Sequence, residues 1–82
     1  MKRIAIIEDE PMMREELAQI MRKAGYDVYT VSSLFDAAEQ VTGSCPDLVV
    51  LDINLPGISG FQICREIKQK SPVPVLVLAS RD

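Results

Sequence analysis

The chain has 82 residues, of which 48% are hydrophobic and 26% charged, a composition typical of one small globular domain and not of a disordered segment. Twelve acidic residues against nine basic ones give a net charge of −3, which argues against direct binding to nucleic acid or to an anionic membrane. No run of residues reaches the ~18–20 apolar positions of a membrane span, and the apolar run near the amino terminus is too short for a signal peptide. We therefore expect a cytoplasmic protein.

The predicted elements alternate between strands and helices along the whole chain. Short apolar runs predict strands, and apolar residues at helical spacing predict the helices between them. Pro11 suits the first turn of the first helix, and the pairs Ser33 with Asp36 and Ser59 with Gln62 resemble capping boxes that open the second and third helices. The expected elements are strand 3–7, helix 11–24, strand 26–31, helix 34–41, strand 47–51, helix 59–70 and strand 75–78.

This order predicts an α/β fold with a parallel sheet and right-handed crossovers. The expected architecture is a flavodoxin-like, doubly wound sheet with strand order 2-1-3-4 and a switch point between the first and third strands. The first helix would cover one face, and the next two helices would cover the other. The first face would then be bare beside strand 75–78, which would also have an open edge. We expect a homodimer or a domain-swapped association through that face and edge.

Three carboxylates follow buried strands of this predicted sheet. Glu8 and Asp9 come after strand 3–7, and Asp52 comes after strand 47–51. Ligands of open α/β sheets bind at the switch point outside the carboxyl ends of the strands, which is where these side chains would meet. Clustered carboxylates repel unless a cation neutralises them, and Mg²⁺ is typically held by one or two carboxylates with phosphate oxygens. Because an Asp can also accept a phosphoryl group as an acyl phosphate, the pattern predicts Mg²⁺-dependent phosphoryl transfer, with the Ser80 hydroxyl close by.

Histidine is absent from the sequence, and the two cysteines, Cys45 and Cys64, are not spaced as a CxxC motif. The absence of histidine excludes histidine-dependent nucleophilic catalysis by this chain. We expect the cysteines to be reduced, structural thiols, since a cytoplasmic protein rarely keeps disulfides.

Three segments carry a resemblance to a known family. They are IIEDEP at residues 6–11, DLVVLDINLPGISG at 47–60 and VLVLAS at 75–80. Together they closely resemble the receiver domain of two-component response regulators, a CheY-like fold. The resemblance runs the whole length of the chain and implies that residues 1–82 form one receiver domain.

The resemblance also implies a role for each candidate site residue. Asp52 would be the phosphoacceptor. Asp9 and Asp52 would bind Mg²⁺ directly, Glu8 largely through water, and Asn54 through its backbone carbonyl. Ser80 would supply the hydroxyl that follows the phosphoryl group. Mg²⁺ is the only cofactor implied.

Receiver domains take their phosphoryl group from a sensor histidine kinase or a phosphotransfer protein and regulate an output, most often transcription through a DNA-binding domain. The resemblance therefore implies a signalling switch that at most phosphorylates and dephosphorylates itself, and not an enzyme that turns over a substrate. Met12, Met13 and Arg14 would fall on the surface that receivers use to dock the kinase, although Met13 also suits the core face of its helix.

One departure from the family favours an alternative function. Receivers continue with a fourth helix, a fifth strand that carries a phosphoryl-pairing Lys, and a fifth helix, whereas this sequence stops at Asp82. We expect a receiver that is incomplete at its carboxyl end. The alternative is a phosphorylation-impaired binding or oligomerisation module. A phosphatase is a weaker third hypothesis: the segment 52–54 is similar to the DxD loop of haloacid-dehalogenase-type phosphatases, but lacks the second acid.

Overall fold

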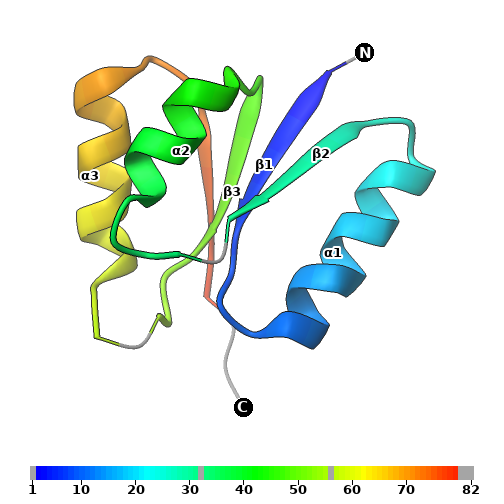
Figure 1. The fold of residues 1–82 in the computed structure, drawn as a ribbon, viewed down its shortest axis with the longest axis horizontal. Coiled ribbons are helices and arrows are strands. Elements are labelled where there is room, and N and C mark those ends of the chain that lie inside the picture. The colour runs from blue at the N-terminus through cyan, green and yellow to red at the C-terminus, as the bar shows by residue number, and fades with distance from the viewer. Residues whose placement is uncertain (1, 32, 56, 80–82) are drawn as a thin grey trace.

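The computed structural model describes residues 2–31, 33–55 and 57–79. Strands and helices alternate along the chain as the sequence predicts (Figure 1). Within these residues, no helix is long and apolar enough to cross a membrane. The strands are β1 (Arg3–Ile7), β2 (Asp27–Val31), β3 (Leu48–Asp52) and β4 (Val75–Leu78), and the helices are α1 (Pro11–Lys23), α2 (Ala37–Ser44) and α3 (Gly60–Lys70).

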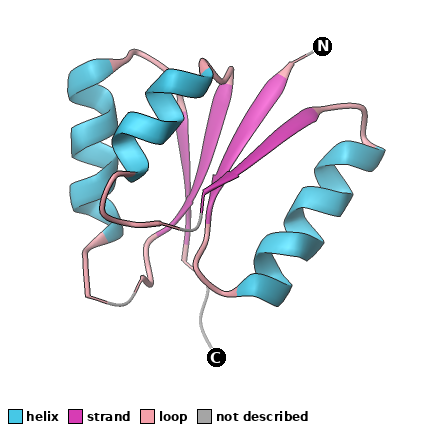
Figure 2. Cartoon of the chain, in the orientation of Figure 1, coloured by secondary structure: helices cyan, strands magenta, loops and turns pink. Residues whose placement is uncertain are grey.

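The four strands form one parallel sheet in the order β2-β1-β3-β4, which confirms the predicted flavodoxin-like order. Helix α1 lies on one side of this sheet, and α2 and α3 lie together on the other (Figure 2). The strand order reverses between β1 and β3, so the carboxyl ends of these two strands border the switch point.

Strand β1 is buried on both faces because its side chains alternate between two cores. Ile4 and Ile6 pack on the α1 side, where Ala18 of the helix is also buried. Ala5 and Ile7 pack on the opposite side against α2 and α3. The buried residues on the α2–α3 side are Ala5, Ile7, Val31, Ala37, Ala38, Val41, Val49, Leu51, Leu55, Ile63, Ile67 and Val73.

Helix α1 begins at the predicted residue, and α3 begins one residue after its predicted start. Pro11 is the first residue of α1, and the Glu10 carboxylate caps this helix by accepting a hydrogen bond from the Met13 N–H at 2.9 Å. The Ser59 hydroxyl caps α3 by accepting from the Phe61 N–H at 3.2 Å. Each cap satisfies a backbone donor that has no partner inside the helix.

The predicted start of the second helix is wrong, because α2 spans Ala37–Ser44 and not 34–41. The expected capping box of Ser33 and Asp36 does not form. Asp36 is the N-cap, but its carboxylate accepts from the Gln40 side-chain amide at 2.9 Å and caps no backbone N–H. The packing explains the shift, since helix residues 37, 38 and 41 are the ones buried against the sheet.

The end of α2 also differs from the prediction. The helix continues past residue 41 to Ser44, so Gly43 lies within it, and the left-handed conformation falls on Cys45, with φ of 53°. Pro46 follows, and it disfavours helical geometry at the residue before it. Both cysteines are free thiols: Cys64 packs against the core and Cys45 is exposed, so only Cys64 fits the expected structural role.

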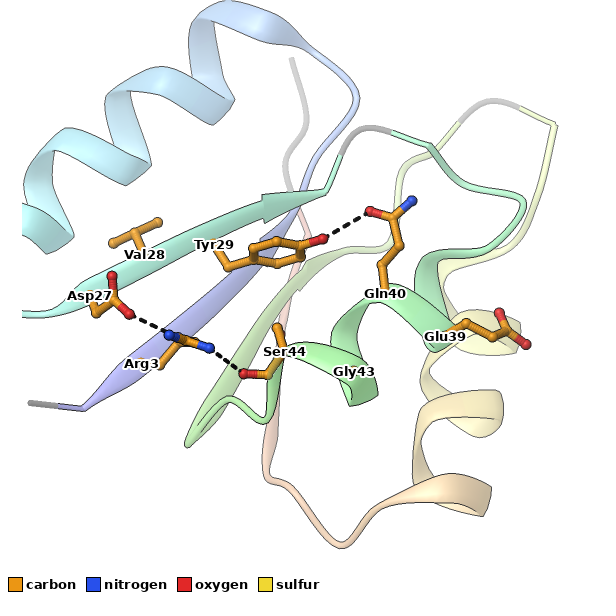
Figure 3. A pocket seen from close by; sticks show the side chains of 8 residues that line it. All are labelled: Arg3, Asp27, Val28, Tyr29, Glu39, Gln40, Gly43 and Ser44. Carbon is orange, nitrogen blue, oxygen red and sulfur yellow. Dashed lines mark hydrogen bonds and ion pairs between the residues drawn. The ribbon is translucent and has the colours of Figure 1, made fainter.

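Arg3 joins three segments at the amino edge of the sheet (Figure 3). Its Nε donates to Asp27 Oδ2 on β2 at 2.8 Å, and its Nη1 donates to the Ser44 carbonyl at the end of α2 at 2.5 Å. Nearby, the Tyr29 hydroxyl donates to Gln40 Oε1 at 3.4 Å. These residues line an open hollow of about 480 Å³ whose polar groups largely bond one another. The hollow lies at the opposite end of the strands from the candidate carboxylates, so we assign it a structural role.

Replacing Arg3 by Met is expected to lower the free energy of unfolding by about 1 kcal/mol, because it removes two charge-assisted hydrogen bonds at a partly exposed position. Urea unfolding measures this change. The matched control is Lys70→Met, since the Lys70 Nζ lies 3.7 Å from Glu39 Oε2 in an exposed pair. Its expected cost is under about 0.5 kcal/mol. Equal costs in the two variants would contradict the structural role of Arg3.

Strand β4 leaves apolar side chains uncovered on the α1 side of the sheet. Leu76 pairs in register with Val50, whose side chain lies in the α1-side core, and Leu76 is 51% exposed. A hollow of about 340 Å³ lies between β4 and α1, lined by apolar residues that include Met13, Ile20 and Leu78. Within the described residues, this confirms the predicted bare face beside the last strand.

Candidate functional site

The two carboxylates at the switch point are buried. Glu8 is the first residue after β1, and Asp52 is the last residue of β3. Their exposed fractions are only 2% and 3%. Asp9, the third predicted carboxylate, is half-buried at the rim. Burying a carboxylate costs free energy unless it is paired, so Glu8 and Asp52 are not ordinary solvated strand ends.

The backbone that follows β3 holds the Asp52 carboxylate in place. Its Oδ1 accepts a hydrogen bond from the backbone N–H of Asn54 at 2.9 Å. The next residue, Ile53, donates its N–H to the Leu78 carbonyl at 3.0 Å, so bonding to β4 continues past the end of β3. The Asn54 backbone thus lies beside the Asp52 carboxylate, whereas the metal-binding role of the Asn54 carbonyl remains a prediction.

Helix α3 packs directly on the strand end that carries Asp52. A Cβ placed on Gly60 would lie 2.4 Å from Ile53 Cα and 2.9 Å from the Asp52 carbonyl oxygen. Only glycine fits at this distance, because real side chains do not approach backbone atoms so closely. The sequence pattern gives no sign of this role of Gly60, since the contact joins elements that only the folded chain brings together.

Glu8 has one satisfied and one unsatisfied oxygen. Its Oε2 accepts from the Glu10 N–H at 3.2 Å. Its Oε1 is fully buried and accepts no hydrogen bond from the described residues. A buried oxygen without a donor is costly and is the kind of group that a cation or an ordered water satisfies.

The pKa of Glu8 is raised from its ordinary value of 4.5 to about 7, and burial is the largest cause. The neighbouring Asp52 carboxylate contributes to this rise, both by accepting a hydrogen bond from protonated Glu8 and by its negative charge. Asp9 adds a smaller repulsion, and the Glu10 N–H acts in the opposite direction. The Glu8 carboxyl group is therefore partly protonated near neutral pH, and a bound cation would displace this proton.

The donor set fits a hard divalent cation. Among the described residues, no three Asp, Glu or Cys side chains come together as a complete metal-binding group. A cation here would therefore need backbone or water oxygens in addition to the carboxylates of Glu8, Asp9 and Asp52, which is how Mg²⁺ is usually held. Ser80, the predicted phosphoryl-sensing residue, lies outside the described residues.

The pKa of Glu8 predicts how stability depends on pH. The folded-state pKa is raised, so the folded protein binds more protons than the unfolded chain between about pH 4.5 and 7, and stability falls as the pH rises through that window. We expect a loss on the order of 2 to 3 kcal/mol in the free energy of unfolding between pH 5 and 8 without divalent cations. Urea unfolding at several pH values measures it.

The matched variant Glu8→Gln isolates this effect because glutamine does not titrate. The difference between the protein and the variant should grow as the pH rises, and Mg²⁺ should restore the stability of the protein at pH 8. The same pH profile in both proteins would show that another group is responsible.

The model of the response regulator receiver domain family matches residues 4–82, nearly the whole chain. The chain belongs to this family of receiver domains. This confirms the family predicted from the sequence and agrees with the sheet order described above.

Known relatives support the same family. The receiver domain is 42% identical over 82 residues to the sensory transduction protein BceR of Halalkalibacterium halodurans, covering all of this chain and 36% of BceR. It thus spans little more than a third of that curated relative. The response regulator TrrA, solved in complex with the histidine kinase ThkA, is 35% identical with a TM-score of 0.87, covering 100% of this chain and 72% of TrrA. TrrA of Thermotoga maritima in complex with Mg²⁺-BeF is 36% identical with a TM-score of 0.85, covering 98% and 72%.

Proposed function

We propose that this receiver domain accepts a phosphoryl group on Asp52 in a Mg²⁺-dependent step and thereby regulates an output. One observation carries the proposal: Glu8 and Asp52 are buried beside each other at the switch point, and Glu8 has a buried oxygen that accepts no hydrogen bond from the described residues. Such an arrangement is costly by itself and is relieved by a cation, which also neutralises an incoming phosphoryl group.

The proposed roles follow from the chemistry of each group. Glu8, Asp9 and Asp52, with the backbone carbonyl of Asn54, would hold Mg²⁺, which when bound neutralises the charge around the phosphoryl group. An Asp52 carboxylate oxygen attacks phosphorus and forms the O–P bond of an acyl phosphate. The N–P bond of the donor phosphohistidine breaks, and its electron pair returns to the imidazole nitrogen. In this scheme Ser80 donates a hydrogen bond to the phosphoryl group, and the domain is a phosphoacceptor and not an enzyme.

The partners are proposed by analogy with the relatives. TrrA has been solved with a histidine kinase and with Mg²⁺-BeF, which supports a kinase or phosphotransfer protein as donor and Mg²⁺ as the cation. BceR is a sensory transduction protein. We propose a cytoplasmic regulator whose output is transcription through a DNA-binding domain, with no direct nucleic-acid contact by this acidic segment.

Incubation with a small acyl-phosphate donor tests the proposal. Intact mass spectrometry should show the gain of one phosphoryl group in the presence of Mg²⁺ and no gain when a chelator removes divalent cations. The same adduct should form with a phosphorylated histidine kinase as donor. No adduct at saturating Mg²⁺ with either donor would contradict phosphoacceptor function and favour the second candidate.

The second candidate is a binding module that self-associates. The exposed Leu76 and Ile20 on the α1 side favour it, because both are large apolar residues left in water. Light scattering coupled to size-exclusion chromatography would then show a dimer that Leu76→Lys dissociates. A monomer at all concentrations would exclude this function for the uncovered face.

A further inference from the structure

Arg14 reaches back from α1 to the loop that carries two of the candidate site residues. It lies in the first turn of the helix, and its Nη1 donates to the backbone carbonyl of Glu8 at 3.0 Å. The resemblance to receivers implies a docking surface that includes Arg14, and that role stays a prediction. The structure gives its guanidinium a partner inside the molecule, and the residue is half-buried.

Among the residues that the structure describes, few other bonds hold the backbone of Glu8 in place. The loop between β1 and α1 consists of residues 8–10. The Glu8 N–H donates to the Val31 carbonyl at 3.4 Å, at the long end of the hydrogen-bond range. The bond from Arg14 is shorter and has a charged donor, which makes it the stronger of the two.

We propose that Arg14 is a positioning residue for the cation site. By holding the Glu8 carbonyl, it fixes the loop and so the directions of the Glu8 and Asp9 side chains beside Asp52. The inference rests on the proposed function, because it assumes that these carboxylates hold Mg²⁺. Partners that orient the ligands of a metal typically change its affinity by tenfold or more when they are removed.

Arg14 acts on the site in two ways that have opposite signs. Its anchoring bond favours cation binding, whereas its positive charge near the site opposes it. The charge effect is screened by salt over about 8 Å at physiological ionic strength, while the anchoring bond is local. Anchoring is therefore expected to dominate, and two substitutions separate the effects. Arg14→Lys keeps the charge but loses the fork geometry that reaches the carbonyl, and Arg14→Gln loses both.

The test measures the dissociation constant of Mg²⁺ by calorimetry at low and high salt. Arg14→Gln should weaken Mg²⁺ binding about tenfold, and Arg14→Lys at least about threefold, at both salt concentrations. The matched control Arg22→Gln, in the last turn of the same helix, should change the affinity less than twofold. In the phosphorylation assay, the Arg14 variants should need more Mg²⁺ for half-maximal rate but reach the maximal rate of the unaltered protein.

The possible failures are distinguishable. If the unaltered protein binds Mg²⁺ and both Arg14 variants bind it equally well, the positioning role is wrong and the proposed function stands. If Arg14→Gln binds more tightly while Arg14→Lys is unchanged, Arg14 acts through charge alone and the inference is overturned. If the unaltered protein binds no Mg²⁺, the proposed function fails and the inference fails with it. In the absence of metal, the backbone amides of residues 8–10 should also exchange hydrogen faster in the Arg14 variants. This measurement tests the hydrogen bond from Arg14 to the Glu8 carbonyl independently of Mg²⁺ binding.

Discussion

An Asp52→Asn variant is expected to gain no phosphoryl group under conditions that modify the unaltered protein. The amide oxygen of asparagine is a poor nucleophile, and an amide cannot form the acyl phosphate. The substitution nearly preserves size and shape at a residue that is 3% exposed. Its side-chain oxygen can still accept the hydrogen bond from the Asn54 N–H, so the fold should be retained. Intact mass spectrometry measures the adduct directly.

The stability of the same variant at pH 8 shows that it remains folded. Asp52 raises the pKa of Glu8, so removing the Asp52 charge should lower that pKa and make the protein without metal more stable at pH 8. The control Asp36→Asn removes an exposed carboxylate in the connection before α2 and should leave phosphorylation unchanged. If Asp52→Asn formed as much adduct as the unaltered protein, another residue would be the phosphoacceptor.

Gly60→Ala is expected to lower the free energy of unfolding by about 3 kcal/mol, a large effect for one methyl group. The added Cβ would lie 2.4 Å from Ile53 Cα, and backbone atoms cannot move aside as a flexible side chain can. Alanine favours a helix over glycine by about 1 kcal/mol, which is too little to offset this overlap. Since the Asp52 carbonyl lies 2.9 Å from the same Cβ, relief of the overlap would also displace the phosphoacceptor and slow its modification.

Gly43→Ala provides the matched control. Gly43 lies inside α2, and a Cβ there would meet no atom within 4 Å. This substitution should stabilise the protein by about 0.5 to 1 kcal/mol because alanine is the better helix former. Urea unfolding of the two variants side by side measures both changes. If Gly60→Ala were also stabilising, α3 would not pack on the end of β3 as described.

Local pattern predicted the strands, their parallel order and the place where Glu8 and Asp52 meet. This succeeded because β1 and β3 are continuous apolar runs that end in acids, and the rules for crossovers leave few alternative orders. The start of α2 could not be predicted in this way. Ser33 and Asp36 had the spacing of a capping box, but packing of residues 37, 38 and 41 against the sheet overrode that signal.

The supporting roles of Gly60 and Arg14 could not be predicted from the sequence, again because tertiary packing determines them. Gly60 looks like an ordinary first helical residue after the Ser59 cap, and its contact with Ile53 exists only once α3 packs on β3. Arg14 looks like a solvated helix residue, and its bond to the Glu8 carbonyl depends on the angle at which α1 leaves the loop. Both contacts join residues through tertiary geometry, which periodicity and spacing do not encode.

The hydrophobic cores on the two faces of the sheet differ greatly in size. Among the described residues, twelve buried side chains form the α2–α3 core, whereas four form the core beneath α1. Local opening is expected to begin where the least apolar surface is buried, so α1 should detach from the sheet more readily than α2 or α3. The loop that carries Glu8 and Asp9 leads directly into this helix. A cation held by that loop would therefore also reduce how often α1 opens, which couples the chemistry of the acidic site to the motion of a whole helix.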